Sequence, residues 1–139
     1  MARRDRARRD RWPAVRTRAD TGPVALIVNP DGSALLVVLP ADERETADAI
    51  HAVVGGDLEG IIGPDWCAYV DEHYLRHERP ANSVADHLAR QLGWIAHPAD
   101  YLCGSVVFLG RRGSRETDVP MHVLAFAGVP IQDDRRSDG

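Results

Sequence analysis

The chain has 139 residues, of which 44% are apolar, an ordinary content for one globular domain with a buried core. Its apolar runs are shorter than the roughly 20 residues that span a bilayer, and the N-terminus lacks the apolar stretch of a secretory signal, so the sequence excludes helical membrane spans and predicts a cytoplasmic protein. All 17 basic residues are arginine against 21 acids, which indicates a GC-rich coding sequence.

The first 20 residues carry a charge opposite to that of the rest of the chain. They hold eight arginines against three aspartates, whereas the other 119 residues hold nine arginines against 18 acids. Almost no apolar residues precede Trp12, so this segment cannot bury enough surface to offset its ordering entropy. We therefore predict a disordered arginine-rich tail over residues 1–22, a single domain over 23–128 and a disordered polar tail over 129–139.

Three explanations of the arginine-rich tail are open at the level of sequence. It is a solvated arm without a partner, an upstream extension that is not translated because the true start codon lies further along, or an arm that binds nucleic acid or an acidic partner. For nucleic acid, Trp12 is the only aromatic side chain in the tail that can stack on a base. The arginines expected to contact phosphates are Arg3, Arg4, Arg6, Arg8, Arg9 and Arg11.

The body of the chain begins with a predicted β-hairpin. Residues 24–29 and 34–39 are apolar and rich in branched side chains, and Pro30-Asp31-Gly32 between them has the composition of a turn. A helix follows, with Asp42 as its N-cap and Glu45 three positions later, as in a capping box. Gly55-Gly56 is expected to end it, after a buried stripe formed by Ala49, Ile50, Val53 and Val54.

A second hairpin and a second helix are predicted in the middle of the chain. Residues 58–62 and 66–70 are strand candidates on either side of the turn Gly63-Pro64-Asp65. The segment 74–80 is polar and irregular. Asn82 then caps a helix that Gly93 stops, with an apolar stripe expected at Val84, Leu88 and Leu92.

The last part of the domain contains one clear strand, over residues 105–109, followed by a loop over 111–117. The segment 118–127 has two interpretations. Asp118 caps a short helix with Pro120 in its first turn, or residues 123–126 form an edge strand. In the helix, the inward-facing residues are Val123, Leu124 and Ala127. The whole pattern predicts an α+β fold with a small mixed, mainly antiparallel sheet of about four or five strands, covered by two or three helices.

Four features of the body resemble the DUF3846 family of small actinobacterial, phage and plasmid proteins, whose biochemical role is unassigned. They are the turn after the first strand, the helix leading to Gly55-Gly56, the helix entry Asn82-x-x-Ala85, and Gly104 before Val106-Val107. The resemblance covers about residues 23–128 and implies an actinobacterial or mobile-element origin. It carries over no catalytic residues, and capping explains Asn82 without a ligand.

A zinc site is the first metal centre that the residue types suggest. Cys67, His73, His77 and Cys103 contain two histidines four residues apart, which share one face of a helix. Zinc modules usually bring a pair of nearby cysteines, however, and both cysteines here are isolated beside apolar residues. We therefore expect no metal, no other cofactor, and no disulfide between these cysteines in a reducing cytoplasm.

The sequence lacks the common catalytic signatures. The segment Glu72 to His77 is not the metalloprotease motif, because its acid precedes the first histidine, and neither a G-x-S-x-G motif nor a phosphate-binding glycine loop occurs. A Cys67 nucleophile with His73 or His97 as its base can be imagined in any small protein with two cysteines and six histidines. We therefore expect no enzymatic activity.

Two sets of residues have the chemistry to bind an anion. One lies in the glycine-containing loop at residues 110–115, where backbone amides accompany three arginines, although a soluble exposed loop explains the same residues. The other lies beside a predicted helix N-terminus. The candidates are Arg76, Arg79, Asn82, Arg111, Arg112, Ser114 and Arg115.

From the sequence we therefore predict a non-enzymatic accessory protein that binds a protein or a small ligand. The alternative is a nucleic-acid-associated protein that acts through the arginine-rich tail, and a small hydrolase is the third hypothesis. No membrane partner is expected.

Overall fold

The computed structural model describes residues 21–97 and 99–128, which form an α+β fold. Nearly all of the two predicted tails lies outside these residues. In chain order the elements are β1 (Val24–Val28), β2 (Ala34–Val38), α2 (Glu43–Val54), β3 (Leu58–Ile62), β4 (Trp66–Asp71), α3 (Ser83–Gln91), β5 (Val106–Arg112), β6 (Arg115–Thr117) and α4 (Met121–Ala127). The mainly antiparallel α+β class predicted from the sequence is confirmed.

The six described strands form a single antiparallel sheet in the order β2-β1-β5-β4-β3, with β6 paired to the end of β5. The loop expected over residues 111–117 is wrong: β5 continues to Arg112, and β6 returns beside it after a turn at Gly113 and Ser114. Glutamate is uncommon in strands and Gly113 is typical of turns, so the composition of this segment did not indicate a short hairpin. Strands β2 and β3 lie at the two ends of the strand order.

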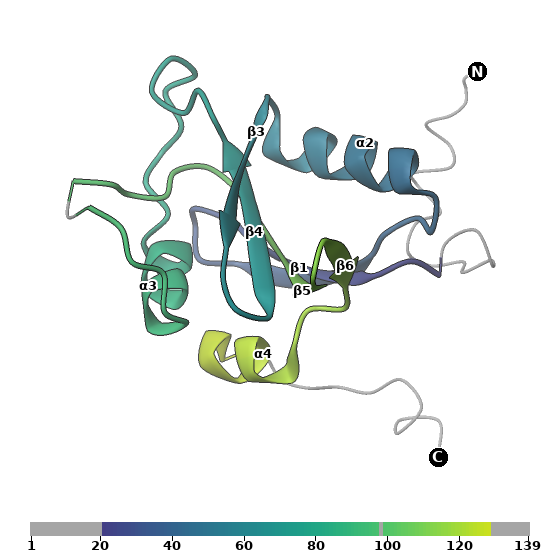
Figure 1. Cartoon of the computed structure of the whole chain (residues 1–139). Coiled ribbons are helices and arrows are strands. Elements are labelled where there is room, and N and C mark those ends of the chain that lie inside the picture. The colour runs from purple at the N-terminus through teal and green to yellow at the C-terminus, as the bar shows by residue number, and fades with distance from the viewer. Residues whose placement is uncertain (1–20, 98, 129–139) are drawn as a thin grey trace.

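Helices cover both faces of the sheet, with α2 on one side and α3 and α4 on the other (Figure 1). The cores on the two faces reflect the alternation of side chains along each strand. Neighbours Val107 and Phe108 of β5, for example, belong to different cores and are both almost fully buried. No helix in the described ranges has the length and apolar character needed to cross a membrane.

The helix boundaries follow the predicted caps, with two corrections. The Asp42 side chain caps α2 by accepting from the Arg44 backbone N–H, and Gly55 ends it in the left-handed region at φ 85°. Segment 118–127 contains a helix, but Asp118 is not its cap, because this side chain accepts instead from the backbone N–H of Val24. Val84 is 40% exposed, since the stripe of α3 begins one residue later, at Ala85.

Candidate functional site

The outer edge of β3 carries unpaired backbone groups. At the two ends of the β3–β4 hairpin, the Gly63 N–H donates to the Trp66 carbonyl and the Glu72 N–H donates to the Asp57 carbonyl, both at 2.8 Å. In an antiparallel pair the inward and outward backbone groups alternate, so Leu58, Gly60 and Ile62 direct their N–H and C=O groups away from β4. No described residue hydrogen-bonds to these outward groups.

A groove of about 430 Å³ runs beside this edge, and we call it the β3 groove. Residues 59–62 of β3 form one side, and Val70 and Tyr74 contribute to its lining. The segments 94–97 and 100–103, from the connection between α3 and β5, form the other side. An open strand edge next to a groove is the arrangement in which an extended peptide adds to a sheet.

Polar contacts from two residues of α3 hold the far wall of the β3 groove in place. Asp86 is 6% exposed and accepts from the Arg90 side chain at 2.8 Å and from the Leu102 backbone N–H at 3.2 Å. Arg90 also donates to the Asp100 carbonyl and lies over the Trp94 ring, 5.0 Å from its centroid. The wall is therefore anchored to α3.

The β3 groove combines exposed apolar side chains with carboxylates. Ile62 is 62% exposed and Ile95 is 95% exposed, and both residues line the groove. Glu59 and Asp100 are exposed, and no arginine lines the groove. Both the apolar surface and the negative charge are thus available to a partner.

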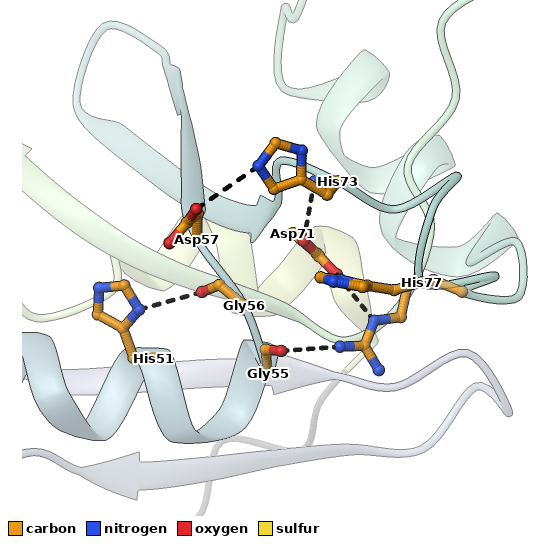
Figure 2. A network of polar contacts seen from close by, with 8 residues as sticks. His51, Gly55, Gly56, Asp57, Asp71, His73 and His77 are labelled. Carbon is orange, nitrogen blue, oxygen red and sulfur yellow. Dashed lines mark hydrogen bonds and ion pairs between the residues drawn. The ribbon is translucent and has the colours of Figure 1, made fainter.

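A second polar feature is a network centred on the buried carboxylate of Asp71, at the end of β4 (Figure 2). Asp71 is 1% exposed and accepts three hydrogen bonds: from His77 Nδ1 at 2.6 Å, from Arg79 Nε at 2.9 Å and from the His73 backbone N–H at 2.8 Å. Arg79 donates further to the Gly55 carbonyl at 2.9 Å. The network thus joins the polar segment after β4 to the end of α2.

The electrostatics of Asp71 are those of an ionised structural carboxylate. Burial acts to raise its pKa, but the hydrogen bonds from His77, Arg79 and the His73 backbone outweigh burial and lower the pKa to about 2. The contact with Asp71 uses His77 Nδ1, so the second ring nitrogen, Nε2, does not take part in it. An aspartate that orients a histidine is one half of a catalytic arrangement, yet neither described cavity is lined by Asp71 or His77.

The two glycines after α2 allow the network to form. A Cβ on Gly56 would lie 2.8 Å from Asp71 Oδ1, and a Cβ on Gly55 would lie 2.7 Å from Arg79 Nη2. Close packing therefore explains the glycine at position 56. At position 55 both close packing and the positive φ require a glycine. The sequence indicated the glycines as a helix end but gave no sign of the buried carboxylate behind them.

The predicted anion-binding residues lie in different settings. Arg79 is bound to Asp71, and Asn82 is fully buried, where its amide donates to the carbonyls of Val28 and Gly104 and its oxygen caps Ala85. Arg76 is exposed. These contacts give Arg79 and Asn82 structural roles; anion binding by either remains a prediction.

The other predicted anion site coincides with the β5–β6 hairpin. Arg111 donates to the Gly63 carbonyl at 2.7 Å, which ties it to the turn between β3 and β4. Arg112 and Arg115 pair across the two strands, and Ser114 lies in the exposed turn. Anion binding here also remains a prediction. The tail arginines Arg3 to Arg11 lie outside the described residues.

The cysteines and histidines considered for zinc are not gathered into one group in the described part of the chain. Cys67 is buried in the core beneath α2, where burial, followed by the charge of Glu116, raises the pKa of its thiol to about 11. The thiol is therefore protonated at neutral pH, which disfavours it as a nucleophile. Tyr69 beside it donates to Glu116, and burial together with this hydrogen bond raises the Tyr69 pKa.

Comparisons with protein-family models, curated proteins and solved structures found no match. The resemblance to DUF3846, and the origin that it implies, therefore remain predictions from the sequence.

Proposed function

We propose that this chain is a non-enzymatic protein-binding module that accepts an extended segment of its partner along the free edge of β3. The observation that carries the proposal is the row of unpaired backbone groups at Leu58, Gly60 and Ile62 beside the β3 groove. A bound strand would satisfy these groups with backbone hydrogen bonds, which supply affinity without requiring one particular sequence. The groove would supply the selectivity.

The chemistry of the β3 groove indicates which partner segment fits it. Exposed Ile62, Ile95 and Tyr101 offer apolar surface, while Glu59 and Asp100 attract positive charge. Charge complementarity of this kind raises association rates and selects among partners. The expected ligand is therefore an extended peptide in which apolar side chains alternate with arginine or lysine.

The other sheet edge offers the natural comparison. The outward backbone groups of β2 belong to Ala34, Leu36 and Val38, because the Leu39 N–H donates to the Pro23 carbonyl and the Asn29 N–H to the Ser33 carbonyl. Leu36 is 36% exposed. Neither cavity described here includes these three residues. Both edges are open, and the groove of about 430 Å³ lies along β3.

The proposal predicts that a displayed library of random 12-residue peptides yields binders that alternate apolar and basic residues. Gly60→Pro is expected to weaken their binding by at least about tenfold, or about 1.4 kcal/mol, because proline removes an outward N–H and obstructs the edge. It leaves the β3–β4 hydrogen bonds intact, since the Gly60 N–H does not take part in them. Fluorescence anisotropy with a synthetic selected peptide measures the change.

Leu36→Pro is the matched control, because it removes an outward N–H from β2 in the same manner. Its affinity for the selected peptides should equal that of the unchanged protein. The function proposed here is wrong if the library yields no binder, or if the binders respond to Leu36→Pro and not to Gly60→Pro.

A further inference from the structure

A cluster of three metal-ligating side chains lies where the β3–β4 hairpin opens. Asp57 precedes β3, and Glu72 and His73 follow β4. One ligand atom from each of these residues lies within 4.8 Å of the other two. In the part of the chain that the structure describes, no other group of three His, Cys, Asp or Glu side chains lies this close together. An imidazole nitrogen distinguishes the group from a purely acidic surface patch.

We propose that Asp57, Glu72 and His73 bind one Zn²⁺ ion, with a fourth coordination position open to solvent or to a ligand. One nitrogen and two carboxylate oxygens are ligands that zinc accepts. Bonds of about 2.0–2.2 Å in a tetrahedron place neighbouring ligand atoms about 3.3–3.6 Å apart. His73 Nε2 and Asp57 Oδ2 are 3.5 Å apart, which matches that separation.

The backbone carrying the three side chains is fixed before any ion binds. The Glu72 N–H donates to the Asp57 carbonyl at 2.8 Å, which holds the two strand ends together. The His73 N–H donates at 2.8 Å to the buried Asp71 carboxylate, so the histidine starts from an anchored position. The Asp57 side chain is 73% exposed and Glu72 is exposed, so both carboxylates can rotate onto an ion.

The ligand atoms are also free of hydrogen bonds to one another. The contact between His73 and Asp57, drawn in Figure 2, is an ion-pair distance too long for a good hydrogen bond. Elsewhere on the surface His122 Nε2 and Asp65 Oδ2 lie 2.8 Å apart in a true hydrogen bond, with no third ligand beside them. The pair His122 and Asp65 therefore serves as an internal control for ordinary histidine–aspartate pairing.

The test is a zinc titration of the metal-free full chain in competition with a chromophoric chelator. The unchanged protein should bind one equivalent, and His73→Ala and Asp57→Ala should each weaken binding by about tenfold or more, because each removes one of three protein ligands. His122→Ala should leave the affinity within about twofold. Neither histidine substitution removes a backbone contact, and thermal melting of each variant verifies that it is folded.

Cobalt and calcium complete the experiment. Co²⁺ in the same site should give a tetrahedral absorption spectrum without a sulfur charge-transfer band, since no cysteine belongs to the cluster. Ca²⁺ should bind far more weakly than Zn²⁺, because a hard cation prefers a larger set of oxygen ligands. The proposal is overturned by the absence of stoichiometric zinc binding, by equal losses in His73→Ala and His122→Ala, by a sulfur band, or by calcium binding as tight as zinc binding.

Discussion

Replacement of Asn82 by aspartate is expected to destabilise the domain by about 3 kcal/mol or more, although aspartate is as good a helix N-cap as asparagine. The Asn82 oxygen caps α3 by accepting from the Ala85 N–H at 3.0 Å, and aspartate would preserve that contact. The Asn82 amide nitrogen also donates to the Val28 carbonyl at 3.0 Å and to the Gly104 carbonyl at 2.8 Å. A carboxylate would direct a buried negative charge at both carbonyls.

Asn82→Ala separates these contributions. It removes the cap and leaves the same two carbonyls without their donor, so we expect a loss of about 2–3 kcal/mol. The expected order of stability is therefore Asn, then Ala, then Asp. Urea unfolding followed by circular dichroism gives the free energies. An aspartate variant as stable as the unchanged protein would show that Asn82 acts as a cap alone.

Asp71→Asn is expected to lower the free energy of unfolding by about 2–3 kcal/mol, because it removes the buried charge that pairs with His77 and Arg79. The expected loss of stability is smaller than the usual loss for a fully buried ion pair, because the side chains of His77 and Arg79 are 35% and 31% exposed. Asparagine has nearly the same shape, so the loss reports on charge and hydrogen bonding. Denaturant unfolding with a chelator present measures it without a contribution from bound metal.

The matched control is Asp65→Asn. Asp65 pairs with His122 at 2.8 Å, but its side chain is 55% exposed, so we expect a change below about 1 kcal/mol. Equal losses of stability at positions 65 and 71 would show that burial does not increase the contribution of the Asp71 network to folding.

Most of the helices and strands could be predicted from residues that lie close together in the sequence. The hairpins could be located from their turn residues, and α2 and α3 from Asp42, Gly55 and Asn82, because each of these signals acts within a few residues. The stripe of α3 was misplaced at Val84 because Ala85 and Ala89 are small and carried little weight in the pattern. Strand β6 was missed because its stability comes from pairing with β5 and from little in its own composition.

The candidate sites were not predictable in the same way, since they depend on long-range arrangement. The strand from Leu58 to Ile62 was predicted, but its place at the sheet edge follows from the strand order. The approach of Asp57 to His73 likewise requires the register of β3 against β4. The buried carboxylate of Asp71 was not predicted either, because the expected strand ended at residue 70 and its partners His77 and Arg79 come from the segment after it.

The most direct test of the proposed function is backbone amide hydrogen exchange with a selected peptide bound. The account predicts that the amides of Leu58, Gly60 and Ile62 become protected on binding, because a paired strand would accept hydrogen bonds from them. The amides of Leu36 and Val38, on the outer edge of β2, should exchange as they do in the free protein. Protection confined to β2, or no new protection at β3, would contradict binding at the β3 edge.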